Sequence, residues 1–584
     1  MDIRDFKSAI FSRRSFILLS IKALILFGLA VRLFFLQILK SKKYQTLSER
    51  NRIKFFLLEP RRGLVSDIKG VSLAENKINY QLYFYRQRGK DYNKVLESVF
   101  KIIPLPQKEQ ANIIKTISKS SYLYPILIQE MLSWRDVVKI ESDNNLPGVY
   151  ISKGYIRFYP LKNFFAHTIG YVGIPNKEEV EKYKLQRVSG FRIGKTGTEK
   201  EMNDKLIGGF GVKKVEVNAY RSVVRELDKD RSVEGDNIAI SIDSRLQEHV
   251  YNTLKPEGSS AVVIEIKTGN IISMVSRPSF DPNMFSFPIS RSDWKKVIGN
   301  EANPLTNRVI SQLYPPGSVW KVITSLAILR DGVDPNEEVM CRGSVKVGSQ
   351  VYKCWKKSGH GMMNMRTALY HSCNAYFYKM GRDATIDNIH SVANILGFGK
   401  KTGVELPGEL AGINPSRSWK EMNYNTSWLI GDTVNHSIGQ GYNLVTPMQL
   451  AVMMSRLSSG LKIKPSLYKN SSKMEKLDIP EKHLRIIRDH MTGVFNNKNG
   501  TGYNLRITEE QYKLAGKSGT AQIVSRDTVG ETDKSVRSHA VFAAYAPVHN
   551  PKYAVAVVAD HAGWGIKEAA PLGIDILYFA QTKL

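Results

Sequence analysis

Hydrophobic positions divide the chain into three parts with different patterns. The first is an almost unbroken apolar run at residues 16–39, in which only Lys22 and Arg32 are charged. As a helix this run would span about 36 Å, which is enough to cross a bilayer. A buried helix of a soluble domain is the alternative, but it would bury both cations, whereas in a membrane they can reach the headgroups. We therefore predict a transmembrane helix over residues 16–39, preceded by a cytoplasmic tail over residues 1–15.

The second and third parts differ in the regularity of their elements. Residues 40–235 mix short strand-like runs with charged, helix-like stretches and contain no cofactor motif or repeat. From residue 236 onward the elements become long, and two β-rich runs, 260–266 and 270–276, are joined by a short turn typical of a hairpin. A second pair of such runs lies near the end, at residues 540–546 and 553–559. Helices between the two pairs predict an α+β domain over residues 236–584, with a sheet assembled from both ends of the segment.

Composition and charge limit the classes of protein that remain. Hydrophobic residues make up 42% of the 584 residues, which excludes a disordered chain. The 84 Lys+Arg against 54 Asp+Glu leave a net charge of +30, which suits nucleic acid or an anionic surface such as a membrane or wall polymer. Long domains that follow a membrane span are translocated largely regardless of their charge. The predicted span therefore places residues 40–584 outside the membrane and argues against nucleic acid as a partner.

A serine and a lysine at the head of an apolar helix form the first candidate for catalysis. Pro315, Pro316 and Gly317 interrupt the chain, and an apolar helix is predicted to begin at or near Ser318. Lys321 lies three residues later on the same face of the first turn, so its amine, partly neutral at pH 7, could act as general base for the Ser318 hydroxyl. The same Ser-x-x-Lys spacing also occurs at Ser66, Ser98, Ser292 and Ser466, but none of these follows a Pro-Pro-Gly stop.

Two further motifs, a Ser-x-Asn loop and a Lys-Thr/Ser-Gly strand, follow the Ser318 pair in the chain. Ser372-Cys373-Asn374, between two helix-like segments, offers a hydroxyl to relay a proton and an amide to orient a substrate. Lys-Thr/Ser-Gly occurs at Lys195, Lys267, Lys401 and Lys517, and only the Lys517 copy is predicted to continue as a strand, through residue 524. Ser-x-x-Lys, then a Ser-x-Asn loop, then Lys-Thr/Ser-Gly is the signature of penicillin-binding proteins and class A β-lactamases.

With these motifs in place, the chain resembles the class B penicillin-binding proteins over nearly its whole length. Residues 60–67, followed by residues 73–76, resemble the family's juxtamembrane motif, and the chain departs from that motif at Ile68, where an Arg is usual. The blocks most similar to penicillin-binding protein 2, the cell-elongation branch, are residues 359–361, 437–441 and 546–547, with the division-specific branch as the second choice. Blocks typical of the family's N-terminal region lie at residues 157–160, 167–171 and 194–199.

The resemblance implies a fold and a reaction. The fold would be α+β: an N-terminal transmembrane helix, an elongated mixed α/β pedestal or dimerisation-type domain over residues 40–235, and a penicillin-binding transpeptidase domain over residues 236–584. The latter would hold a five-stranded antiparallel sheet flanked by helices and an all-α subdomain. The reaction would be D,D-transpeptidation of peptidoglycan stem peptides during elongation, through a Ser318 acyl-enzyme and inhibited by β-lactams.

Residue roles follow from the same resemblance. Ser318 would be the nucleophile and Lys321 its base. Ser372 and Lys517 would pass a proton to the leaving amine, and Asn374 would hold the peptide. The residues expected at the substrate carboxylate and oxyanion are Ser518, Gly519 and Thr520.

The implied setting is an inner membrane with the large domains in the periplasm. The expected partners are stem peptides on lipid-linked precursor strands, a SEDS-type glycan polymerase and other proteins of the elongation complex. The rival functions are a division-specific transpeptidase, a D,D-carboxypeptidase or β-lactamase that admits water, and a non-enzymatic β-lactam sensor or scaffold.

All cysteines of the chain cluster beside one histidine. Cys341, Cys354, His360 and Cys373 lie within 33 residues, a set that fits a closed Cys3His zinc site. Cys373 is the middle residue of the Ser-x-Asn loop, so a metal there would brace that loop and would not be needed for acyl transfer. A Cys341–Cys354 disulfide and buried free thiols are the alternatives.

Overall fold

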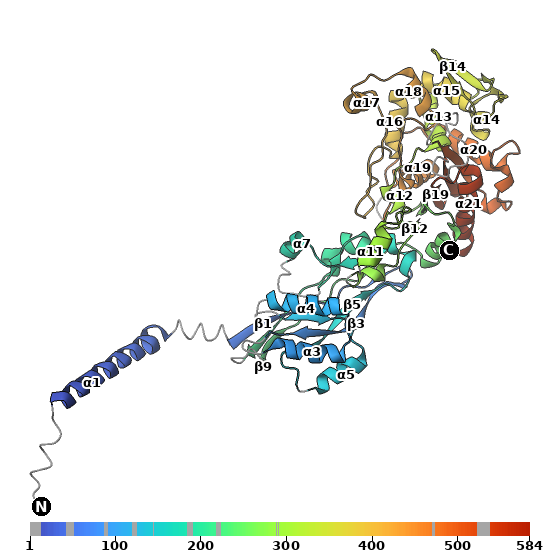
Figure 1. Cartoon of the computed structure of the whole chain (residues 1–584). Helices are drawn as coiled ribbons and strands as arrows, with labels where there is room; N and C mark the ends of the chain where they lie inside the picture. The colour runs from blue at the N-terminus through green and yellow to red at the C-terminus, as the bar shows by residue number, and fades with distance from the viewer. Residues whose placement is uncertain are drawn as a thin grey trace, which may run out of the picture.

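The computed structural model describes residues 13–41, 52–86, 91–119, 125–143, 145–183, 191–217, 223–287, 289, 291–469, 474–522 and 538–584. Most of the expected tail and the junction at residues 42–51 lie outside these ranges. Figure 1 shows three successive parts: an isolated helix, a pedestal built on two sheets, and a larger domain that carries the remaining helices.

The first helix begins slightly earlier than predicted. α1 (Arg13–Phe34) continues without a break into the π-helical turn η1 (Phe35–Leu39). The stretch Ser15–Leu39 has a mean hydropathy of 2.2 over its most apolar window, and none of that window packs against the rest of the chain. A soluble helix with this composition would bury its apolar side chains, so its full exposure fits a helix that lies in a bilayer.

The pedestal consists of a three-stranded antiparallel sheet and a larger sheet that is antiparallel except for the parallel pair β10–β2, with helices on the larger one. In the larger sheet the long strand β3 pairs with β5 over ten residue pairs, from Glu75↔Phe158 to Phe84↔Val149. Helices α3, α4 and α5 cover it with apolar side chains at helical spacing, such as Val95, Leu96 and Val99. The elements are β1 (Ile53–Leu58), β2 (Val65–Ser66), β3 (Ser72–Phe84), α3 (Tyr92–Ile102), α4 (Gln107–Lys119), β4 (Ile126–Gln129), α5 (Trp134–Ser142), β5 (Val149–Phe158), β8 (Gly211–Val217), β9 (Val223–Asp230) and β10 (Ile238–Ala239).

A group of short elements joins the pedestal to the second domain. These are η2 (Lys162–Phe164), α6 (Ala166–Ile169), β6 (Val172–Gly173), α7 (Lys177–Lys182), β7 (Ile193–Gly194), α8 (Gly197–Glu201) and α9 (Asn203–Leu206). Asp67 fixes the junction, because its buried carboxylate accepts hydrogen bonds from the backbone N–H groups of Lys69, Val71 and Ser244. Ile68, which replaces the usual Arg, is exposed, and its backbone N–H still donates to the carbonyl of Ile242.

The second domain is built on a five-stranded antiparallel sheet, as the family resemblance implied, and it is assembled from both ends of the segment, as the apolar runs predicted. Its strand order is β12-β11-β19-β18-β17, so the two hairpins from opposite ends of the segment pair through β11 and β19. Both faces are covered, which explains why the strands are continuously apolar. Helices α10 and α21 pack on one face, and α19 packs on the other. The elements are α10 (Ser244–Thr253), β11 (Ser259–Glu265), β12 (Ile271–Ser276), β17 (Ala515–Ala521), β18 (His539–Ala546), β19 (Tyr553–Ala559) and α21 (Gly565–Lys583).

Helices between the two hairpins form a mainly α-helical layer, as expected. They include η3 (Pro282–Phe285), α11 (Arg291–Ile298), α12 (Arg308–Ser311), η4 (Gly317–Trp320), α13 (Lys321–Arg330), α14 (Met365–Tyr370), α15 (Asn374–Asp383), α16 (Ile386–Leu396), α17 (Arg417–Tyr424), α18 (Ile430–His436), α19 (Pro447–Ser459), α20 (Glu481–Asn496), η5 (Tyr503–Leu505) and η6 (Glu510–Tyr512). Two small antiparallel strand pairs interrupt this layer: β13 (Val339–Cys341) with β16 (Gly361–Met363), and between them in the chain the hairpin β14 (Ser344–Val347) with β15 (Gln350–Lys353).

Candidate active site

The turn before α13 places the first candidate pair. The predicted helix begins as the 3₁₀ turn η4, and α13 itself starts only at Lys321, because Gly317 adopts φ +54° directly before Ser318. Ser318 stays partly exposed, whereas the next three residues are buried. The turn is held from both sides, since the N–H of Gly317 donates to the carbonyl of Gly439 at 3.0 Å and β17 packs against η4. The hydroxyl of Ser318 is thus presented on a fixed turn.

Lys321 is directed at the Ser-x-Asn loop. Its side chain is fully buried, and its Nζ donates to the Oδ1 of Asn374 at 2.6 Å and to the carbonyl of Ser372 at 2.8 Å. A third, longer contact of 3.3 Å reaches the hydroxyl of Ser372. Burial lowers the pKa of Lys321 to about 8, because the low-dielectric surroundings disfavour the ammonium form. A substantial neutral fraction near pH 8 is the form that can accept a proton.

Lys517 reaches the same hydroxyl from the sheet. Its Nζ donates to the Oγ of Ser372 at 3.1 Å and to the carbonyl of Ser518 at 3.2 Å. Burial and, secondarily, the charge of Lys321 hold the pKa of Lys517 well below its ordinary value. The Ser372 hydroxyl therefore bridges two buried amines, which is the arrangement needed to pass a proton between them.

The Ser-x-Asn loop is strained and buttressed. Ser372 adopts φ +52°, a left-handed conformation that is costly for a residue with a side chain. Trp355 holds it in place by donating its indole N–H to the carbonyls of His371 and Ser372, both at 3.1 Å. Sequence reasoning missed Trp355, and the only signal was its position directly after Cys354.

β17 is an edge strand beside the nucleophile. Among the strands of the described residues it pairs only with β18, so in this part of the chain its other edge is free of strand pairing and is available to an extended peptide. Gly519 is required there, because an added Cβ would lie 2.6 Å from the carbonyl oxygen of Pro316. An added Cβ on Gly317 would lie 3.0 Å from the backbone nitrogen of Thr520, which shows how closely the strand and the turn approach.

The remaining residues predicted at this strand are also in place. Ser518 follows Lys517, and Thr520 accepts two contacts: its hydroxyl accepts from the N–H of Gly565, and its carbonyl accepts from the side chain of Gln440, both at 3.3 Å. Gln440 belongs to the 437–441 block and was not predicted as a contact of the strand. The expected continuation of the strand to residues 523 and 524 falls outside the described residues.

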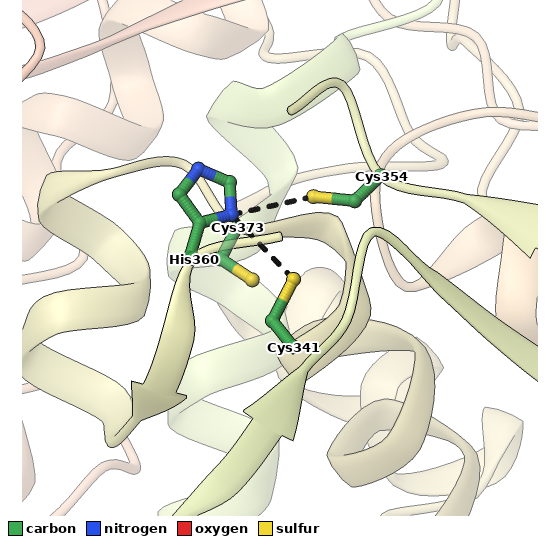
Figure 2. A group of neighbouring side chains, drawn as sticks. All are labelled: Cys341, Cys354, His360 and Cys373. Atoms are coloured by element: carbon green, nitrogen blue, oxygen red, sulfur yellow. Dashed lines mark hydrogen bonds between the residues drawn. The ribbon is translucent and has the colours of Figure 1, made fainter. Parts of the chain in front are cut away.

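The three cysteines and His360 converge, as Figure 2 shows. Their ligand atoms all lie within 4.8 Å of one another, and the Nδ1 of His360 is 3.6 Å from the sulfur of Cys341 and 3.5 Å from that of Cys354. The cysteines are buried and unpaired, so the Cys341–Cys354 disulfide is not formed. Four ligands from β13, the end of β15, the start of β16 and the Ser-x-Asn loop fit the tetrahedral Cys3His set of structural zinc.

Comparison with known proteins shows two matched regions. Residues 57–240 match the penicillin-binding protein dimerisation domain, and residues 259–578 match the penicillin-binding protein transpeptidase domain. The chain is 32% identical to the peptidoglycan D,D-transpeptidase MrdA of Haemophilus influenzae, over 98% of this chain and 92% of that one. Identity to MrdA of Escherichia coli K12 is also 32%, over 96% and 93% of the two chains.

Solved structures show the same similarity in three dimensions. Penicillin-binding protein 2 of Helicobacter pylori, in its complex with MreC, has a TM-score of 0.81 and 28% identity, covering 91% of this chain and 99% of that one. Penicillin-binding protein 2 of Pseudomonas aeruginosa, in complex with the compound WCK 5153, has a TM-score of 0.67 and 28% identity, covering 90% and 97%.

Proposed function

This chain belongs to the penicillin-binding D,D-transpeptidases, and from that premise we propose how its own residues carry out the acyl transfer. The observation that carries the proposal is the position of the Ser372 hydroxyl between two amines. It lies 3.1 Å from the Nζ of Lys517 and 3.3 Å from the Nζ of Lys321, which directly follows the turn that presents Ser318. The Ser318 Oγ attacks the carbonyl of the penultimate D-Ala of a donor stem peptide and releases the terminal D-Ala. An acceptor amine from a second stem then attacks the acyl-enzyme, regenerates Ser318 and forms the cross-link.

Lys321 serves as the base for the first step. Its amine lies one turn from Ser318, and its lowered pKa provides a neutral form without any carboxylate partner. Its present hydrogen bonds go to the loop residues Ser372 and Asn374, and catalytic hydrogen bonds commonly tighten only when substrate is bound. The proton taken from Ser318 can move through the Ser372 hydroxyl, which Lys517 also contacts, to the leaving amine of D-Ala.

The open edge of β17 receives the donor peptide. In this proposal the peptide lies antiparallel to β17, with Gly519 allowing close approach and the amide of Asn374 orienting the backbone. The N–H groups of Ser318 and Thr520 stabilise the oxyanion, and the hydroxyls of Ser518 and Thr520 lie near the terminal carboxylate. Such fixed donors supply a large part of the barrier reduction in acyl transfer.

We assign the enzyme to cell-wall elongation, anchored by α1 in the inner membrane, with residues 40–235 as pedestal and residues 236–584 as the periplasmic transpeptidase domain. Similarity to MrdA over nearly the whole chain supports this assignment over a division-specific role. One solved relative is bound to MreC, and another similar structure, with a TM-score of 0.70, is titled as a peptidoglycan synthase complex that coordinates polymerization and crosslinking. These support partners of the same kind here, including a SEDS-type glycan polymerase.

Labelling with a fluorescent penicillin tests the nucleophile. We expect the full chain to be labelled, and Ser318→Ala to lose the label because no acyl-enzyme can form. Ser98→Ala is the matched control, since Ser98-x-x-Lys101 has the same spacing on the exposed side of α3. Labelling that survives in Ser318→Ala would overturn the assignment, and release of the label within seconds would favour a β-lactamase.

The cysteine cluster is proposed as a structural zinc site that braces the Ser-x-Asn loop. Its support is the convergence of four potential ligands, one of them Cys373 within the loop itself. Metal analysis of the purified protein should find one zinc per chain, which is lost in Cys354→Ser. His371→Gln is the control, because His371 lies beside His360 but outside the cluster. A wild-type protein purified without zinc would contradict the proposal.

A further inference from the structure

The segment that carries the cysteine cluster has a strong excess of positive charge. From Val339 to Arg382 the sequence contains no Asp or Glu and eight Lys or Arg residues. Residues 433–474 also lack Asp and Glu but carry only five Lys or Arg residues, so the number of basic side chains, and not the absence of acids alone, distinguishes the cysteine segment. Like charges gathered in one place repel one another and weaken the folded state unless a partner of opposite charge is bound.

Several of these side chains are exposed and form no ion pair with a carboxylate in the described part of the chain. Two of the eight have acidic partners elsewhere: Arg366 pairs with Asp489 and Arg382 pairs with Asp383. Residues 339–363, which we call the basic insert, hold five of the eight, and within the described residues four of these five form no ion pair: Arg342, Lys346, Lys356 and Lys357.

Backbone packing brings these charges together on one surface. An added Cβ on Gly343 would lie 2.1 Å from the carbonyl oxygen of Lys357, and one on Gly359 would lie 2.9 Å from the Cα of Arg342. Both glycines have positive φ, so the chain folds back tightly here. The segments that carry Arg342 and Lys356–Lys357 are therefore neighbours, and Lys346 extends from the adjoining hairpin β14–β15.

The basic insert borders the catalytic loop. Trp355, which directly precedes Lys356, donates its indole N–H to the carbonyl of Ser372. Lys356 is therefore the chain neighbour of a residue whose side chain contacts the loop that holds Ser372 and Asn374. A ligand bound at this loop would meet the charges of the basic insert if it were longer than the reacting dipeptide and left the site on the Trp355 side.

We infer that the basic insert binds the free carboxylates of a peptidoglycan strand as it runs out of the cleft, an inference that rests on the proposed function. Stem peptides carry carboxylates at side chains and termini, and several exposed cations attract such a polymer over a distance of about 10 Å. An anionic bilayer is the other surface of suitable charge. Figure 1 places β14 at the end of the molecule farthest from the pedestal strand β1, which follows the membrane helix, so the insert faces away from the membrane end.

Binding of peptidoglycan strands to the full chain in zwitterionic nanodiscs tests this inference. The variant combines Lys346→Gln, Lys356→Gln and Lys357→Gln. The control combines Lys482→Gln, Lys498→Gln and Lys567→Gln, which removes the same charge from exposed lysines outside the insert. The probes are uncross-linked glycan strands with free carboxylates and the same strands after amidation. Each sample is first titrated with fluorescent penicillin, so that only the protein able to form the acyl-enzyme is counted.

We expect the insert variant to bind native strands about 3- to 10-fold more weakly than wild type at low salt, since three exposed charge interactions are lost. The difference should shrink at high salt, and amidated strands should bind wild type as weakly as native strands bind the variant. An unchanged affinity, or an equal loss in the control, would overturn the inference. The inference would also be overturned if the insert variant bound phosphatidylglycerol vesicles more weakly than wild type but bound peptidoglycan strands equally well. A wild type that binds strands but takes up no penicillin would instead contradict the proposed function.

Discussion

Two clusters of buried charged side chains, one in each domain, differ in what faces the charges. In the pedestal, Glu199 lies between two arginines, with its carboxylate 2.6 Å from the Nε of Arg62 and 2.6 Å from that of Arg157. In the transpeptidase domain, Lys321 and Lys517 are buried together, and their hydrogen-bond partners are a hydroxyl, an amide and backbone carbonyls. The first cluster pairs opposite charges, and the second does not.

The consequence is visible in the direction of the pKa shifts. Burial alone would raise the pKa of Glu199, but the charges of Arg157 and Arg62 lower it below its ordinary value, so the carboxylate stays ionised. Burial lowers the pKa of both lysines, and no carboxylate counters it; only the nearby Cys373 and Cys354 thiols oppose the shift, at Lys321. A cluster that keeps its charges serves to hold the fold, whereas one that gives them up near neutral pH can transfer protons.

Replacing Lys321 should have the largest effect on this contrast. Lys321→Met keeps the length and apolar stem but removes the base, and the rate of acylation by fluorescent penicillin should fall by about 10²- to 10⁴-fold. Lys420→Met is the matched control, because Lys420 is also buried but pairs with Asp432 at 2.6 Å. The control should lose stability and keep its acylation rate per folded molecule. Equal losses of rate in both variants would mean that burial of a lysine, and not its lack of an acid, is what matters.

Replacing Glu199 tests the ion-pair cluster of the pedestal. Glu199→Gln leaves two buried guanidinium groups without their carboxylate, which typically costs about 3–5 kcal/mol. Urea unfolding should show this loss at pH 7. Because the folded pKa of Glu199 is lowered, its stabilisation is present above the ordinary pKa near 4.5 and is lost as pH falls through the folded value. The difference between wild type and variant should therefore shrink in acid, and a difference independent of pH would contradict a charged carboxylate.

The pH dependence of acylation gives a smaller effect. With a pKa of about 8, roughly a tenth of Lys321 is neutral at pH 7 and about nine tenths at pH 9, so the acylation rate should rise about 10-fold over this range. Stopped-flow labelling of wild type measures it. A rate that is flat between pH 7 and pH 9 would show that the amine is not the base, or that its pKa lies elsewhere.

The sequence was sufficient to select the candidate catalytic residues, which the structure brings together, but not the residues that support them. Ser318, Ser372 and Lys517 could be chosen because each of three short motifs had a distinct local context, and their order restricted the choice further. The strands 260–266 and 553–559 were predictable as well, since unbroken apolar runs indicate a sheet covered on both faces. The 3₁₀ start at Gly317 was not, because a positive φ at one glycine shifts the helix by a turn without changing the periodicity.

Contacts between distant segments were also out of reach. Trp355 and Ser372 are 17 residues apart, and Gln440 and Thr520 are 80 apart. Neither pair carries a spacing that local propensity or periodicity can detect, because both result from how separate loops pack over the finished sheet. The pairing of Glu199 with Arg62 and Arg157 is of the same kind, although all three lie in blocks that had already suggested the family.

The smallest effect concerns the support of the proton-transfer cluster. Trp355→Phe keeps the ring but removes the N–H that donates to the carbonyls of His371 and Ser372, a contribution of about 1 kcal/mol. Because Ser372 is held at a strained φ of +52°, its hydroxyl should leave the bridging position part of the time, and acylation should slow about 2- to 5-fold. Trp428→Phe loses an indole hydrogen bond of the same kind, to Thr433 at 2.8 Å, away from the catalytic loop, and should acylate at the wild-type rate. If both variants slow equally, the loop does not depend on Trp355. If only Trp355→Phe slows, uncharged hydrogen bonds hold the catalytic loop in place, as the ion pairs of Glu199 hold Arg62 and Arg157 in the pedestal. The difference is that the ion pairs keep their partners charged, whereas the uncharged contacts leave the two lysines able to lose a proton.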